Sequence, residues 1–345
     1  MSHPVSDKLI AWYQKHKRAL PWRDINDPYK IWLSEIILQQ TQVAQGLSYY
    51  QKFIEIFPNV NLLAKAKEDK VLQLWQGLGY YSRARNLHAA AKTVSKEYKG
   101  QFPKTYDDIK NLKGVGDYTA AAIASFAYNL PYAVVDGNVY RVYARVFDIA
   151  IPINSTEGKK QFQLLANELL NAKKPALHNS AIMEFGALHC KPQNPLCETC
   201  PIQVHCSAYK NNTISLRPVK QKKITIKHRY LHYFVLNYKN KVYVQKRTQK
   251  DIWQNLYEFF LIETQEPMPS NQLLENTSLL QLTSQFKVQS IQVVAKHMLS
   301  HQHLHTTFYE LNLESPIRKH ESLRLVNRCD LETLAIPQLI KKYLK

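Results

Sequence analysis

The spacing of apolar residues changes once along this chain, and this change limits the possible folds more than any other feature. Up to residue 206, apolar side chains recur every three or four positions, as in residues 30–50 and 84–94. That period predicts amphipathic helices. Beyond residue 229, runs that favour β-structure, with Val, Thr, Tyr and Phe among their residues, lie at 230–236, 241–246 and 301–311 and predict strands. We therefore expect an all-α domain followed by an α+β domain.

A strongly basic stretch separates the two patterns. Seven Lys or Arg residues and no acidic residue lie between Ser207 and Arg229, a composition that predicts an exposed linker. We place the helical region at residues 1–206, the linker at 207–228 and the second domain at 229–345. A purely solvated linker and one that lies along a phosphate backbone fit this composition equally well.

The charge of the whole chain predicts a polyanionic partner. Its 345 residues include 46 basic and 27 acidic side chains, a formal net charge of +19. Such a field attracts nucleic acid. An anionic membrane surface is the weaker alternative, because no helical segment combines a dense basic face with an apolar one. The beginning of the chain has no secretory pattern, so we expect a cytoplasmic protein that associates with DNA.

The segment 112–139 combines an anion-binding turn with a carboxylate. Gly114, Val115 and Gly116 precede an Ala-rich helical run, and Asp136 follows it. A glycine turn before a helix can present backbone N–H groups to a phosphate. An ordinary connection between helices is the alternative, because Gly-x-Gly alone is a weak pattern.

Four of the five cysteines lie within seventeen residues, at Cys190, Cys197, Cys200 and Cys206. In a chain with no secretory signal this density favours metal ligation over disulfides. The spacing fits Zn²⁺ and a [4Fe-4S] cluster equally. The fifth, Cys329, is expected to be a buried thiol.

Together these motifs resemble the helix-hairpin-helix DNA glycosylases of the endonuclease III branch, and among them the MutY-type adenine DNA glycosylases. The resemblance also includes the segments 20–23 (LPWR), 32–43 (WLSEIILQQTQV), 77–87 (GLGYYSRARNL) and 135–139 (VDGNV). It implies a [4Fe-4S] cluster at the four cysteines, in a loop spanning 186–206. It also implies a C-terminal domain similar to a Nudix hydrolase, which lacks the Nudix catalytic pattern here.

The implied reaction is removal of adenine mispaired with 8-oxoguanine or guanine from duplex DNA, by a monomer, in base excision repair. Releasing a base needs an acid for the leaving group and an anion beside the cationic sugar. Glu35, in an apolar helix that would raise its pKa, fits the acid, and Asp136 fits the anion. Asn138 is expected to hold the water or the carboxylate, with a helix cap as the alternative.

Tyr118 predicts that the reaction stops after removal of the base, before the strand is cut. The bifunctional relatives carry at this place a lysine that forms a Schiff base and cuts the strand, and a tyrosine cannot do so. One alternative is a glycosylase with lyase activity on oxidised pyrimidines, and the missing lysine argues against it. A non-catalytic iron–sulfur DNA-binding protein is another.

Extrusion of a base requires residues that fill the space it leaves. The resemblance assigns this wedge to the 77–81 turn, phosphate contacts to the basic residues that follow, and reading of 8-oxoguanine to a C-terminal loop. Leucine replaces the usual phenylalanine in that loop. Ser180 and Lys113 also depart from the family pattern, at places where Glu or Gln and Pro are usual. The assigned residues are Leu78 and Tyr80 with Gln40 and Thr41 opposite, then Arg83 and Arg85, and finally Leu299, Ser300 and His301.

Overall fold

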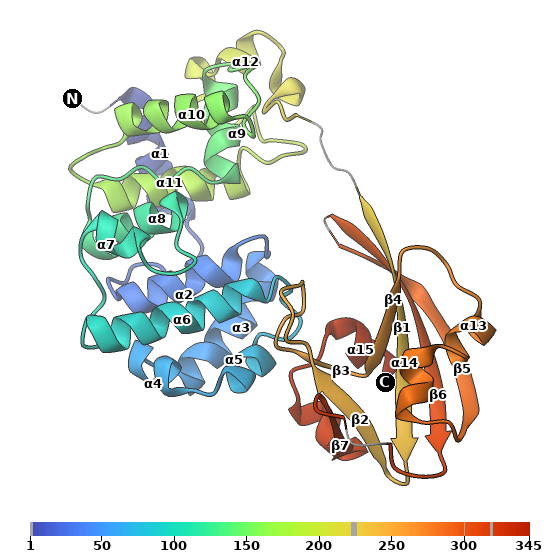
Figure 1. The fold of residues 1–345 in the computed structure, drawn as a ribbon. Coiled ribbons are helices and arrows are strands. Elements are labelled where there is room, and N and C mark those ends of the chain that lie inside the picture. The colour runs from blue at the N-terminus through green and yellow to red at the C-terminus, as the bar shows by residue number, and fades with distance from the viewer. Residues whose placement is uncertain (1–2, 222–225, 300, 318–319) are drawn as a thin grey trace. The chain divides into compact units, whose positions relative to one another are not determined.

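The computed structural model describes residues 3–221, 226–299, 301–317 and 320–345. The chain forms two compact units (Figure 1). One comprises Met1–Lys65 and Asn86–Lys222, and the other comprises Ala66–Arg85 and Lys223–Lys345. The segment 66–85 thus groups with the C-terminal half of the chain, although its sequence pattern is helical.

The first unit is helical, and polar caps fix where several of its helices begin. The side chains of Asp27, Asp136 and Ser155 accept backbone N–H bonds at the starts of α2, α9 and α10, which is the usual function of an N-cap. The helices are α1 (Pro4–His16), α2 (Pro28–Leu38), α3 (Val43–Ile56), α4 (Val60–Lys65), α6 (Ser82–Glu97, whose first turn belongs to the second unit), α7 (Tyr106–Lys110), α8 (Asp117–Tyr128), α9 (Gly137–Val146), α10 (Thr156–Leu169), α11 (Pro175–Leu188) and α12 (Ser207–Lys210).

Helix α8 connects two groups of helices in this unit. It contacts α2 and α7 on one side and α11 on the other, while α11 also packs on α1 and α9 (Figure 1). The core of the second group includes Trp12, Tyr143, Phe162 and Phe185, all buried. Residues from both groups can therefore meet beside α8.

The second unit is built on a seven-stranded sheet with the strand order β3-β2-β1-β6-β5, where β4 pairs with β1 and β7 pairs with β2. Strands β1 and β6 are parallel, and the other pairs are antiparallel. The elements are α5 (Glu68–Leu74), β1 (Lys227–Tyr238), β2 (Lys241–Lys246), β3 (Tyr257–Glu258), β4 (Phe260–Thr264), α13 (Ser270–Leu274), α14 (Thr277–Leu282), β5 (Phe286–Met298), β6 (Gln302–Leu313), β7 (Leu323–Asn327) and α15 (Gln338–Tyr343).

Helices cover both faces of this sheet. Leu273 and Leu279, from α13 and α14, pack with Tyr309 of β6. Tyr343 of α15 stacks on Phe308, with ring centroids 3.9 Å apart. Adjacent residues of a strand point to opposite faces, so α15 lies on the face opposite α13 and α14. The predicted α+β class is confirmed.

Several local expectations need correction. The basic stretch is not a bare linker over its whole length: α12 forms at its start, and Arg217 pairs with Asp148 at 2.8 Å in the helical unit. Sequence reasoning missed β7. The last helix, α15, begins only after Pro337, because the ring of proline fixes φ and removes an N–H donor. Cys329 is exposed rather than buried.

Candidate functional site

Glu35 is a buried carboxyl group on α2. Residues 31–37 of this helix are all buried, and Glu35 is 9% exposed. The hydroxyl of Tyr118 donates a hydrogen bond to Glu35 Oε2 at 2.8 Å. Burial raises the pKa of Glu35, while the Tyr118 bond and the charge of Arg23 oppose that rise. The expected upward direction of the pKa thus follows from desolvation.

Asp136 is the N-cap of α9. Its Oδ1 accepts the backbone N–H groups of Asn138 and Val139, each at 2.8 Å, and its Oδ2 accepts the Asn138 side-chain amide at 2.7 Å. Burial raises the pKa of Asp136, and these bonds oppose the rise because they stabilise the anion. Asn138 therefore orients the carboxylate, and the helix cap is Asp136 itself.

Arg141, which sequence reasoning missed, extends the hydrogen-bond network of Asp136 and Asn138. Arg141 Nη2 donates to Asn138 Oδ1 at 2.8 Å and to the Gly186 carbonyl at 2.7 Å, and Arg141 Nε donates to the Cys190 carbonyl at 2.8 Å. Its position one helical turn after Asn138 is the sequence signal that could have identified it. Arg141 thereby connects the Asp136 cap with the cysteine loop.

These residues line one cavity of about 870 Å³ in the helical unit. Its wall brings together six predicted site residues that the sequence keeps far apart: Glu35, Gln40, Thr41, Tyr118, Asp136 and Asn138. Among them, Gln40 has a positive φ of 53° in the turn after α2. Two of the carboxyl groups in its wall, those of Glu35 and Asp136, thus have different hydrogen-bond partners.

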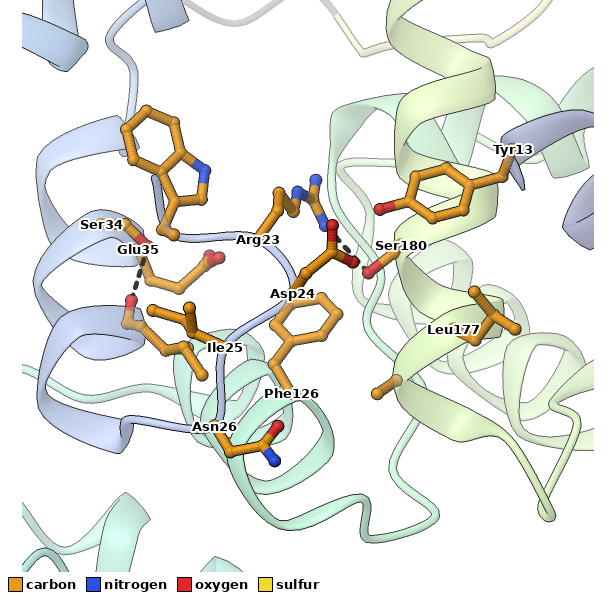
Figure 2. A pocket seen from close by; sticks show the side chains of 13 residues that line it. Tyr13, Arg23, Asp24, Ile25, Asn26, Ser34, Glu35, Phe126, Leu177 and Ser180 are labelled. Atoms are coloured by element: carbon orange, nitrogen blue, oxygen red, sulfur yellow. Dashed lines mark hydrogen bonds between the residues drawn. The ribbon is translucent and has the colours of Figure 1, made fainter. Parts of the chain in front are cut away.

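A smaller pocket of about 210 Å³ also has Glu35 in its wall (Figure 2). Glu35 extends from α2 toward Arg23, and Arg23 Nη1 donates to Ser180 Oγ of α11 at 2.9 Å. The carboxylate of Glu184 lies 4.0 Å from Arg23 and is held by Arg18 at 2.7 Å. Ser180, the departure noted in the sequence, thus helps to fix the guanidinium beside Glu35.

The two hairpin glycines differ in backbone conformation and in their surroundings. Gly114 has φ +81°, and a Cβ there would lie 2.6 Å from the Cβ of Asn86. Gly116 caps α8 with an ordinary negative φ, and a Cβ there would meet nothing within 4 Å. Val115 is buried and anchors the turn. Gly116 therefore needs no left-handed backbone, and it leaves open space before a helix N-terminus.

The four clustered cysteines are free thiols in one loop. Burial raises the pKa of Cys200 to about 12, so its thiolate requires a nearby cation. Arg145 Nη1 lies 3.4 Å from Cys190 Sγ. Among the described residues, no group of three Cys, His, Asp or Glu side chains is arranged to hold a single metal ion.

The wedge turn belongs to the sheet unit. Gly77 and Gly79 have positive φ values of 106° and 71°, as does Tyr80 at 45°. Tyr80 is 44% exposed, whereas Leu78 is buried. Arg83 donates to the Leu78 carbonyl at 3.3 Å, and Arg85 donates to the Gln254 carbonyl at 2.8 Å. Both arginines therefore brace the protein backbone here, and their contact with phosphate stays a prediction.

A second cavity, of about 470 Å³, lies within the sheet unit. Its lining includes Leu78, Tyr80, Trp253, Leu299 and His301. The wedge turn and the predicted reading loop thus share one cavity. Ser300, the remaining residue predicted to read the base, lies outside the described residues.

The family models that this chain matches define its class as a helix-hairpin-helix base excision repair protein. Residues 33–171 match the HhH-GPD superfamily base excision DNA repair protein family, residues 190–206 match the iron–sulfur binding domain of endonuclease III, and residues 231–345 match the NUDIX domain. The iron–sulfur match resolves the choice left open by the spacing in favour of a [4Fe-4S] cluster.

The comparisons with individual proteins are more specific. The adenine DNA glycosylase of Buchnera aphidicola subsp. Baizongia pistaciae is 36% identical over 85% of this chain and 82% of its own length. That of Mus musculus is 44% identical over 59% of this chain and 41% of its own length. The chain belongs to the adenine DNA glycosylase family, and it is an enzyme of base excision repair that acts on DNA.

Solved structures support the fold of the helical unit. A thermostable thymine-DNA glycosylase is 30% identical with a TM-score of 0.56, and it covers 60% of this chain and 95% of its own. An endonuclease III bound to DNA without a covalent link has a TM-score of 0.51 at 21% identity, which shows the fold alone.

Among the described residues, the helices are too short or too polar to cross a bilayer.

Proposed function

We propose that Glu35 and Asp136 divide the chemistry of adenine removal in the larger cavity of the helical unit. The observation that carries this proposal is that both carboxyl groups line one cavity while their partners differ. The volume of about 870 Å³ falls in the range of ligand pockets. An extruded nucleotide bound there meets an acid on one side and an anion on the other.

Glu35 is the general acid. Its burial favours the protonated form, and a proton transferred to the adenine ring allows the base to leave as a neutral molecule. Tyr118 holds the carboxyl group at 2.8 Å. Because Tyr118 has no amine, the enzyme removes the base and leaves the strand uncut.

Asp136 is the anion that stabilises the cationic sugar. Its three amide donors fix the carboxylate and favour its charged form. Asn138, which supplies two of these donors, orients the reactive oxygen and receives a bond from Arg141. A [4Fe-4S] cluster held by Cys190, Cys197, Cys200 and Cys206 would support the loop to which Arg141 is bonded.

The sheet unit reads the base opposite the adenine as 8-oxoguanine or guanine. Its cavity combines apolar surfaces with the imidazole of His301, beside the exposed ring of Tyr80. An aromatic ring can replace the stacking that is lost when the adenine leaves the helix. The hairpin Gly114–Gly116 supplies the open helix N-terminus that a phosphate approaches.

A single assay tests these proposals. The protein is incubated with duplexes containing A:8-oxoguanine, A:G, A:T or 8-oxoguanine:C, and strand breaks are measured before and after hot alkali. We expect alkali-dependent breaks at adenine in the first two duplexes. Breaks without alkali would contradict the monofunctional reaction, and equal cleavage of A:T would contradict the reading of the opposite base.

A further inference from the structure

A buried arginine lies beneath the predicted reading loop and takes no part in the chemistry above. Arg229, on β1, is 8% exposed. Its Nε and Nη2 donate to the two carboxylate oxygens of Glu263, each at 2.7 Å. Its Nη1 and Nη2 donate to the two oxygens of Asp251, at 3.0 and 2.8 Å. A fifth bond runs from Nη1 to Gln302 Oε1 at 3.0 Å.

A guanidinium carries five N–H donors in a fixed planar fork, and every donor of Arg229 therefore has its own acceptor. The acceptors come from three places in the sheet unit: Glu263 is on β4, Asp251 is in the loop after β2, and Gln302 is the first residue of β6. Arg229 thus sets the mutual positions of these three segments. A lysine, with three donors on a flexible stem, could not do the same.

The Gln302 contact is connected directly to the reading loop. The Gln302 carbonyl accepts the backbone N–H of Leu299 at 2.8 Å, and the His301 carbonyl accepts the backbone N–H of Lys227 at 3.0 Å. Leu299 and His301 line the cavity of the sheet unit, as do Asp251 and Gln302. The start of β1 therefore holds the described residues of the loop by one backbone bond and one side-chain bond.

Charge balance alone does not explain the Gln302 bond. Asp251 also binds Arg247, at 2.5 Å, and Arg247 binds Glu258 at 2.6 Å. Two bidentate carboxylates already neutralise Arg229. Ion pairs around a buried guanidinium add little net stability compared with apolar packing, but they fix geometry. The amide of Gln302 extends this fixed geometry to the loop.

We propose that Arg229 is a positioning residue for discrimination of the opposite base, acting through Gln302 on the loop that carries Leu299 and His301. This inference rests on the proposed reading function of that loop. Arg229 does not touch DNA in this role. It fixes the place from which the loop residues distinguish 8-oxoguanine from guanine.

The test uses Gln302, which is partly exposed, so that its replacement leaves the buried ion pairs intact. Gln302→Leu has a similar size and no acceptor oxygen, whereas Gln302→Glu keeps the acceptor. The measured quantity is the ratio of single-turnover excision rates on A:8-oxoguanine and A:G duplexes. We expect Gln302→Leu to lower this ratio about tenfold, as for a lost hydrogen bond to a charged group. Gln302→Glu should retain the ratio.

Two further variants separate positioning from general loss of structure. Arg229→Lys should lower the ratio as Gln302→Leu does. Arg247→Lys changes an equally buried arginine of the same network that does not bond Gln302, and it should leave the ratio unchanged. An equal fall in Arg247→Lys, or an unchanged ratio in Gln302→Leu, would overturn the proposal. If the unmodified protein already shows a ratio near one, the reading function itself fails instead.

Discussion

The carboxyl groups of the predicted catalytic cavity and those around buried Arg229 in the sheet unit have different partners. Glu35 receives a neutral hydroxyl and Asp136 receives amide groups. Within the described ranges, neither has a Lys or Arg nitrogen within 4.0 Å. In the sheet unit, Asp251 and Glu263 are each bonded to Arg229.

This difference has opposite electrostatic results. Desolvation raises the pKa of both Glu35 and Asp136, whereas the bonds from Arg229 and its neighbours lower the pKa of Asp251 to about 2. A carboxyl group without a permanent cation takes up a proton more readily than one locked to guanidinium groups. The predicted catalytic cavity therefore leaves Glu35 and Asp136 reactive, whereas the carboxylates bonded to Arg229 in the sheet unit fix geometry.

The largest expected effect tests the reactive side of this comparison. Glu35→Gln keeps the size of the side chain but removes the transferable proton. We expect adenine excision to fall by about 10²- to 10⁴-fold, measured as a single-turnover rate, while the duplex still binds. The matched control is Glu258→Gln, a buried carboxyl group of the sheet unit, which should leave that rate unchanged. A normal rate in Glu35→Gln would exclude Glu35 as the acid.

The second prediction tests the rigid side. Arg247→Leu leaves Glu258 buried without its cation, and we expect it to lower the free energy of unfolding of the sheet unit by about 3–5 kcal/mol. Amide hydrogen exchange in β2 and β3 would report this loss. The exposed pair of Lys17 with Asp24 is the control, because Lys17→Leu should leave the free energy of unfolding nearly unchanged. Equal losses of unfolding free energy in the two variants would contradict the proposed rigid role of the Arg247 pair.

The hairpin of the helical unit offers a matched pair of smaller changes. Gly114→Ala meets both a positive φ and Asn86, so it should cost about 1–2 kcal/mol of stability and weaken DNA binding. Gly116→Ala meets nothing within 4 Å, so it should fold normally and weaken only DNA binding. Melting temperatures and binding curves at fixed salt distinguish the two. Unchanged binding in Gly116→Ala would show that no phosphate approaches there.

The smallest effect concerns the pH dependence of excision. The Tyr118 hydroxyl stabilises ionised Glu35 and so lowers the pKa of Glu35. Tyr118→Phe should therefore raise that pKa. The acid must be protonated to act, so the rate is lost as pH rises through this pKa. The alkaline limb of the pH–rate profile should move to higher pH in the variant. A shift to lower pH would contradict this assignment.

Much of the fold could be predicted from local patterns. The change of apolar period at residues 207–228 predicted a helical region and an α+β region, and the spacing of the four cysteines predicted a metal centre. These signals are local, because helix and strand periods and ligand spacing depend on residues that are close together in the sequence. The strand β7 was missed because its run, LRLVN, is too short for a clear alternation of apolar and polar residues.

The sequence by itself determined which groups could act: two carboxyl groups, a tyrosine in place of lysine, and four thiols. Only the tertiary structure decided their partners. It joined Tyr118 to Glu35 across 83 positions, inserted Arg141 between Asn138 and Cys190, and grouped the wedge turn with the sheet unit. It also placed Arg229 beneath the reading loop. Such contacts depend on packing between distant segments, and no local spacing encodes the hydrogen bond that one buried group makes with another.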